Sequence, residues 1–143
     1  MSVQVGLNFR IRAAAPGDGR QVLRCLRRAY GRAHPLPVFA VERGFLADCG
    51  GEVLGVLAFS QGPGGFQLET VAVDPARQGR GIGSALIRFA EEEALLAGFA
   101  SVQAAVPERN GPALAVCEKL GYRPVERQPG PGGALISLRK PLA

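Results

Sequence analysis

The sequence is poor in the residues that usually hold metals and disulfides. It has one histidine and three cysteines, Cys25, Cys49 and Cys117, which lie far apart. An odd cysteine count without a CxxC pair argues against a disulfide framework and against a zinc site. We therefore expect no bound metal, and a reduced, cytoplasmic setting is the simplest interpretation. No apolar run is long enough to span a bilayer, and the N-terminus lacks a signal peptide pattern, so we expect no membrane partner.

Aromatic residues are also scarce, and this bears on which partner the basic charge of the chain would suit. The chain carries a net charge of +5, which suits either nucleic acid or a polyanionic small molecule. Nucleic-acid binding usually combines a basic patch with aromatics, but this chain has no tryptophan and only two tyrosines. The basic residues gather at 20–32, interpreted as a solvated helix face, and at 77–80. We expect no nucleic-acid partner.

Alternating strand and helix patterns run through the chain without a composition break. The length of 143 residues and the apolar content of 47% fit a single domain over residues 1–143. Expected strands are 9–13, 45–49, 53–60, 66–73, 100–106, 122–126 and 134–138; expected helices begin near Asp18, Ser84 and Asn110. This order predicts an α/β fold with a mixed, mostly antiparallel central sheet flanked by helices. It does not predict a doubly wound nucleotide-binding fold.

Residues 71–88, VAVDPARQGRGIGSALIR, hold the most informative motif. Three glycines follow a strand pattern and open a helix, so the backbone can bend and a ligand can approach the main chain. The first amides of a helix have no intrahelical acceptor, and together with the helix dipole they form an anion site. Arg77 and Arg80 would add charged hydrogen bonds to phosphate. The alternative is a tight turn without a ligand.

Three kinds of phosphate-binding loop contain glycines in a similar arrangement, and they differ in the residues around those glycines. A P-loop requires a Gly-Lys pair, which the chain lacks. A dinucleotide loop follows its strand directly and needs an acidic residue at the end of the next strand. Here residues 74–78 intervene, and the next strand ends in QAAVPER without that acid. The pyrophosphate loop of acetyl-CoA-dependent acyltransferases is the remaining type.

These residues resemble the GNAT superfamily of N-acetyltransferases. QGRGIG at 78–83 matches its [QR]xxGx[GA] signature, and LETVAVDP ahead of it is similar to the family's fourth strand. PERNGPALAVCEKLGY is similar to a second cofactor motif, and RIRAAAPGDGRQVLRCL to a family N-terminus. The resemblance covers residues 9–140 and implies a GNAT-like fold.

The resemblance also implies a site for acetyl-CoA as co-substrate. The amides of 79–84 would hold the pyrophosphate, and the main chain of 71–73 would pair with the pantetheine arm. Asn110 would contact the pantetheine, or would only cap its helix. The implied cofactor-binding residues are Val71, Ala72, Val73, Arg77, Gln78, Gly79, Arg80, Gly81, Ile82, Gly83, Ser84 and Asn110.

Catalytic residues are less well defined by the sequence. An amine needs a base because it is mostly protonated at neutral pH. Glu69, the acidic residue within the cofactor strand, is the candidate base, and a surface or cross-strand charge is the equal alternative. His34 lies beside prolines and is a weaker candidate. The family's usual general acid is a tyrosine, whose position here holds Cys117; we interpret Cys117 mainly as a packing residue, with a role as the acid left open.

The predicted function is transfer of an acetyl group from acetyl-CoA to a primary amine by direct attack, without a covalent enzyme intermediate. The alternative is a non-catalytic acyl-CoA-binding or sensing module, which the missing tyrosine would suit. The amine acceptor is not identified, and a homodimer is left open. Acceptor contacts are expected from residues 28–44 and 127–133, where a basic rim would favour acidic acceptors.

Overall fold

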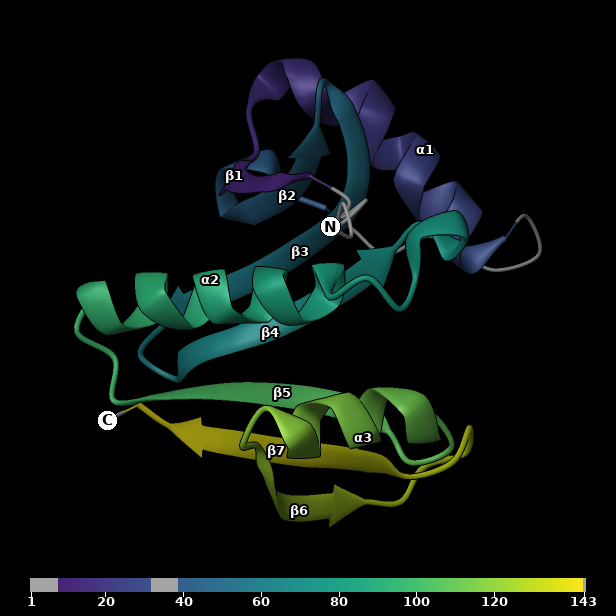
Figure 1. The fold of residues 1–143 in the computed structure, drawn as a ribbon. Coiled ribbons are helices and arrows are strands. Elements are labelled where there is room, and N and C mark those ends of the chain that lie inside the picture. The colour runs from purple at the N-terminus through teal and green to yellow at the C-terminus, as the bar shows by residue number, and fades with distance from the viewer. Residues whose placement is uncertain (1–7, 32–38, 143) are drawn as a thin grey trace, which may run out of the picture.

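A seven-stranded sheet with three helices makes up the computed structural model, which describes residues 8–31 and 39–142 (Figure 1). The elements are β1 (Arg10–Ala13), α1 (Gly19–Tyr30), β2 (Gly44–Cys49), β3 (Glu52–Gly62), β4 (Gly65–Val73), α2 (Ile82–Leu96), β5 (Ser101–Pro107), α3 (Gly111–Lys119), β6 (Arg123–Gln128) and β7 (Leu135–Pro141). The strand order is β1-β2-β3-β4-β5-β7-β6, and only β4 and β5 pair in parallel. The predicted fold class, a mixed and mostly antiparallel sheet flanked by helices, is confirmed.

The helices cover the two faces of the sheet unequally. One core cluster joins α2 and α3 to the sheet through residues such as Leu86, Ala90 and Cys117. The other cluster joins α1 to the opposite face through Val22 and Leu26. Figure 1 shows α2 crossing β3 and β4, while α3 lies over β5 and β7. α2 and α3 therefore cover one face of the sheet, and α1 covers the other.

A β-bulge interrupts β4 at Glu69. Ala58 of β3 lies opposite Thr70, but Phe59 lies opposite Leu68, so Glu69 is the extra residue without a partner. A bulge places two consecutive side chains on one face and so breaks the usual alternation. Glu69 and Thr70 both contribute to the α1 side of the sheet, although neighbouring strand residues alternate.

The parallel pairing between β4 and β5 is short. It joins Phe66, Leu68 and the residue between them to residues 102–104, and it does not continue along either strand. Beyond this point β4 stays paired with β3, and β5 stays paired with β7. The two strands therefore separate at the bulge, and β4 presents backbone groups to the opening.

An ion-pair network fixes the N-terminal edge of the sheet. The Arg12 guanidinium donates to Asp18 at 2.8 and 2.9 Å and to Asp48 at 2.8 Å. Asp18 also accepts from the Ala15 amide, and Asp48 from the Gly51 amide, both at 2.7 Å. Hydrogen bonds to Arg12 and Ala15 lower the pKa of Asp18 from 3.8 to about 2. The network ties β1 to the start of α1 and to the β2–β3 turn.

We predict that Asp18→Asn lowers the free energy of unfolding by about 1–2 kcal/mol at pH 7. Because the pKa of Asp18 is depressed in the folded state, its stabilisation is complete above the unfolded pKa near 3.8 and is lost as pH falls toward 2. Urea unfolding at pH 7, 4 and 2.5 measures this. Glu93→Gln, which removes an exposed carboxylate from α2, is the control. A difference between wild type and Asp18→Asn that does not change with pH would contradict the assignment.

Candidate functional site

The loop between β4 and α2 presents free backbone amides. Gly79 and Gly81 have φ values of 78° and 80°, which favour glycine, and Gly81 is the N-cap of α2. The Ala85 amide is the first to donate within the helix, to the Gly81 carbonyl at 3.0 Å. In the described parts of the chain, no amide of residues 79–84 donates to a protein acceptor. The dipole and free amides of α2 together suit an anion.

Asp74 anchors the beginning of this loop. Its amide donates to the Leu54 carbonyl at 2.8 Å, and its carboxylate accepts from the Ala76 amide at 3.0 Å. The same carboxylate pairs with the Arg28 Nε of α1 at 2.9 Å. These contacts fix the start of the loop to β3 and to α1.

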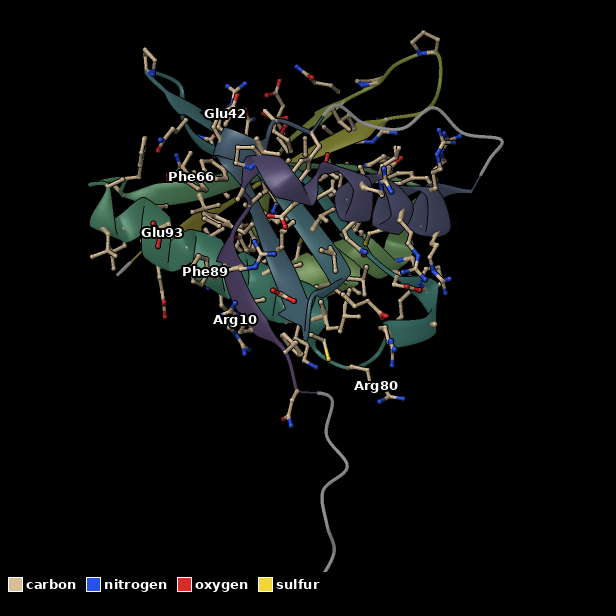
Figure 2. The ribbon with its side chains drawn as sticks, turned by 90° about the horizontal axis from the view of Figure 1, so that it is seen from above. Arg10, Glu42, Phe66, Arg80, Phe89 and Glu93 are labelled. Carbon is tan, nitrogen blue, oxygen red and sulfur yellow. The ribbon has the colours of Figure 1, made fainter. Side chains whose placement is uncertain are left out.

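The two loop arginines differ in their surroundings. Arg77 lies 3.4 Å from the Glu52 carboxylate, so it is partly neutralised. Arg80 is exposed, and Figure 2 shows its side chain extending away from the loop into solvent. Among the described residues Arg80 has no ion-pair partner, so it is the freer of the two cations for an anionic ligand.

A cavity of about 190 Å³ occupies the opening between β4 and β5. Residues 68–71 of β4 and 104–107 of β5 line its two sides. Ile87 and Cys117 line it from the face covered by α2 and α3, and Tyr30 lines it from α1. Because these residues come from both faces, the cavity passes through the sheet where the strands separate.

Glu69 lies at the junction between this cavity and a second one. The second cavity, of about 450 Å³, lies on the α1 face and is lined by residues that include Arg43, Ser60, Glu69 and Thr70. Glu69 and Thr70 line both cavities. The Ser60 hydroxyl donates to Glu69 Oε1 at 2.5 Å, which orients the carboxylate across the bulge. Glu69 forms the cross-strand contact expected of a structural charge, and it also lies between two cavities, as expected of a catalytic base. The structural role therefore does not exclude the catalytic one.

Asn110 and Cys117, two further predicted site residues, line the cavity between β4 and β5. Asn110 lines the cavity, and its side chain accepts from the Ala113 amide at 3.3 Å as the N-cap of α3. Cys117 is buried and belongs to the core, and burial raises the pKa of its thiol. The second tyrosine, Tyr122, is fully buried and donates to Glu91 at 2.7 Å, so it does not reach the cavity. His34 lies outside the described residues.

The predicted site residues did not include four polar residues that line the cavities, namely Tyr30, Arg43, Ser60 and Thr70, although Tyr30 and Arg43 fall within residues 28–44, where acceptor contacts were expected. Tyr30, whose pKa is raised by burial, reaches the opening from the end of α1, while Ser60 and Arg43 line the second cavity. Helical spacing placed Tyr30 with the apolar face of α1, and nothing local marked Ser60 or Thr70. For these two residues, the signal lies in the register between β3 and β4.

Within residues 8–31 and 39–142, no group of three or more His, Cys, Asp or Glu side chains is arranged to hold a metal ion. None of the helices in these ranges combines the length and hydropathy needed to cross a bilayer.

Comparison with protein families identifies the class. The model of the acetyltransferase (GNAT) family matches residues 19–122, which is most of the chain and includes the glycine loop and both cavities' main lining segments. The chain therefore belongs to the GNAT acetyltransferase family, and the resemblance found in its sequence is confirmed. A search of curated proteins gave no match.

Solved structures agree on the fold. The ribosomal-protein-S18-alanine N-acetyltransferase of Escherichia coli is 22% identical, with a TM-score of 0.80 and 95% of each chain covered. Ard1 from Thermoplasma volcanium is 18% identical, with a TM-score of 0.80 over 94% of this chain and 98% of that one. PaiA N-acetyltransferase from Thermoplasma acidophilum, solved in complex with coenzyme A, is 14% identical, with a TM-score of 0.79 over 95% and 100%.

Proposed function

We propose that this acetyltransferase takes its acetyl group from acetyl-CoA and transfers it to a primary amine by direct attack. The observation that carries the proposal is the position of Glu69, between a cavity that crosses the sheet and a cavity on the α1 face. Family membership supports an acyl donor of the CoA type, and one structural neighbour was solved with coenzyme A.

The donor would bind along the separated edge of β4. The amides of residues 79–84 would hold the pyrophosphate, with Arg80 adding charge. The edge of β4 that faces β5 is unpaired beyond Leu68, so residues 71–73 can accept the pantetheine as an added strand. Asn110 lines the same opening while capping α3, so capping does not prevent it from contacting the pantetheine. The thioester would then lie in the cavity that crosses the sheet.

The acceptor would enter from the α1 face. Glu69 would take a proton from the ammonium group, directly or through a water, and the free amine would attack the thioester carbonyl. A C–N bond forms, the C–S bond breaks, and the electron pair leaves with the CoA sulfur as a thiolate. The second proton of the acylated nitrogen would pass through water to this thiolate. A thiolate is a good leaving group at its ordinary pKa near 8.5, so a protein acid is helpful but not required.

A non-catalytic acyl-CoA-binding or sensing module is the second candidate. The observation that favours it is the buried Cys117 thiol at the position where the family usually has a tyrosine. Both candidates require CoA binding, but only the enzyme releases CoA thiol when amines are added. A thiol-release assay with an amine panel therefore separates them.

We predict that Gly81→Asp lowers CoA affinity by about 100-fold or more, because it places a carboxylate where the pyrophosphate would bind. No atom lies within 4 Å of a Cβ at Gly81, and short polar residues tolerate its positive φ, so the fold should survive. Calorimetry with CoA measures the effect. Gly81→Asn has the same shape without the charge and should lose less affinity. Unchanged affinity in Gly81→Asp would reject the loop as the phosphate site.

Glu69→Gln should lower the rate at pH 7 by about 100-fold or more, since glutamine cannot take the amine proton. The amide oxygen can still accept from Ser60, so the bulge should persist. The loss should shrink as pH rises, because the free amine becomes more abundant without a base. Initial rates between pH 6.5 and 9.5 measure this, with Glu93→Gln as the control. Wild-type activity at pH 7 would return Glu69 to a purely structural role.

For Cys117→Ala, we expect intact CoA binding and most of the turnover. Cys117 packs in the core, and its raised pKa makes it a poor source of thiolate, although a thiol can still donate a proton. Steady-state kinetics and calorimetry together test this. A fall of about 100-fold in kcat with unchanged CoA affinity would instead identify Cys117 as the general acid.

A further inference from the structure

The larger cavity, on the α1 face, has two ionisable groups of opposite charge among the described residues that line it. Arg43 directly precedes β2, which pairs with one edge of β3, and Glu69 lies on β4, which pairs with the other edge and brings Glu69 to Ser60. Within the described chain, no ion pair joins Arg43 to Glu69 or to another carboxylate. The remaining lining residues are apolar apart from Thr70. The cavity therefore offers a separate cation and anion to a ligand.

Local packing holds the backbone of Arg43 in place. Arg43 ends a short 3-10 helix, Val41–Arg43, and its amide donates to the Ala40 carbonyl at 3.0 Å. Gly44 follows and begins β2, where a Cβ would overlap the Phe39 ring. The close contact between this ring and the glycine limits the movement of the segment, so the backbone of Arg43 is held at the cavity wall.

Two other arginines in the N-terminal half of the chain already have carboxylate partners. Arg12 pairs with Asp18 and Asp48, and Arg28 pairs with Asp74. Glu42 is adjacent to Arg43 in sequence, but it is exposed and does not line the cavity. An arginine without such a partner, at the wall of a concave site, suits a carboxylate on a ligand because the guanidinium fork matches carboxylate geometry.

We propose that the amine acceptor carries a carboxylate close to its reacting amine, and that Arg43 binds this carboxylate while the amine lies at Glu69. The inference rests on the proposed transfer to an amine and specifies the class of acceptor. The carboxylate can come from two sources. It is the acceptor's own carboxyl group in a free amino acid, or an Asp or Glu side chain at the second position of a peptide.

Matched pairs of acceptors test the proposal and distinguish the two sources. One arm compares each of a panel of L-amino acids with its carboxamide. The other compares tripeptides that carry Asp or Asn at position two. In one of the two arms, the kcat/KM measured by thiol release should be at least about tenfold higher for the acceptor with the carboxylate than for its matched amide. A neighbouring carboxylate raises the pKa of the amine, so less of the amine is free to react at pH 7. Intrinsic reactivity therefore favours the amide member of each pair, and a preference for the carboxylate member must come from the protein.

Variants at Arg43 connect the preference to this side chain. Arg43→Gln should remove the preference for the carboxylate acceptor, mainly by raising the KM for that acceptor. The kcat/KM for the matched amide should stay nearly the same. Arg43→Lys should keep part of the preference, because the charge remains without the planar fork. Arg88→Gln removes an exposed arginine from α2 and is the matched control.

Two outcomes overturn the proposal. In one, wild type uses both members of every pair equally, or uses none of them although it acetylates other amines. In the other, Arg43→Gln retains the carboxylate preference. Calorimetry with CoA and thiol release with the wider amine panel separate these results from failure of the proposed function. A chain that does not bind CoA fails at the donor site, and a chain that binds CoA but releases thiol with no amine of the panel fails as an enzyme.

Discussion

The early end of the pairing between β4 and β5 is the constraint on which the site depends. If the parallel ladder continued past Leu68 and Ala104, the sheet would be closed at its centre. Its two faces, with α2 and α3 on one and α1 on the other, would then be separate. The bulge at Glu69 occurs at the same point and places a carboxylate at the edge of the opening. In the proposed reaction, a donor and an acceptor that bind on opposite faces would meet at this opening.

A sheet with such a short central ladder needs other connections between its halves. Glu91 of α2 supplies one, because its carboxylate accepts from Tyr122 at 2.7 Å and from Lys140 of β7 at 2.9 Å. Burial and the neighbouring Glu91 raise the pKa of Tyr122, which keeps its phenol protonated as a donor. Because the buried carboxylate is both paired and hydrogen-bonded, its desolvation is offset. Phe66 of β4 adds an edge contact to Phe99, with ring centroids 5.7 Å apart.

Local sequence determined the elements and the glycine loop, but not the register that completes the site. The positive φ at Gly79 and Gly81 follows from the need for a sharp turn before α2, so sequence spacing could predict it. Glu69 could be named as a candidate base from its strand, whereas its bulge depends on how β3 pairs with β4. The same pairing sets the contact from Ser60. The place of Arg43 depends on where its segment packs after a long connection, and single-sequence patterns do not encode that packing.

The surroundings of Cys117 bear on whether the acetyl group would pass directly to the amine or first to a cysteine of the enzyme. A covalent route would need a thiolate in contact with the thioester, and Cys117 is the cysteine that lines the cavity. Burial raises its pKa, and the cavity residues named above place no cation beside it that would stabilise the anion. In the proposed reaction the amine would have a carboxylate, that of Glu69, at the junction of the two cavities to remove its proton. The base would therefore serve the acceptor, and these surroundings favour attack by the amine itself.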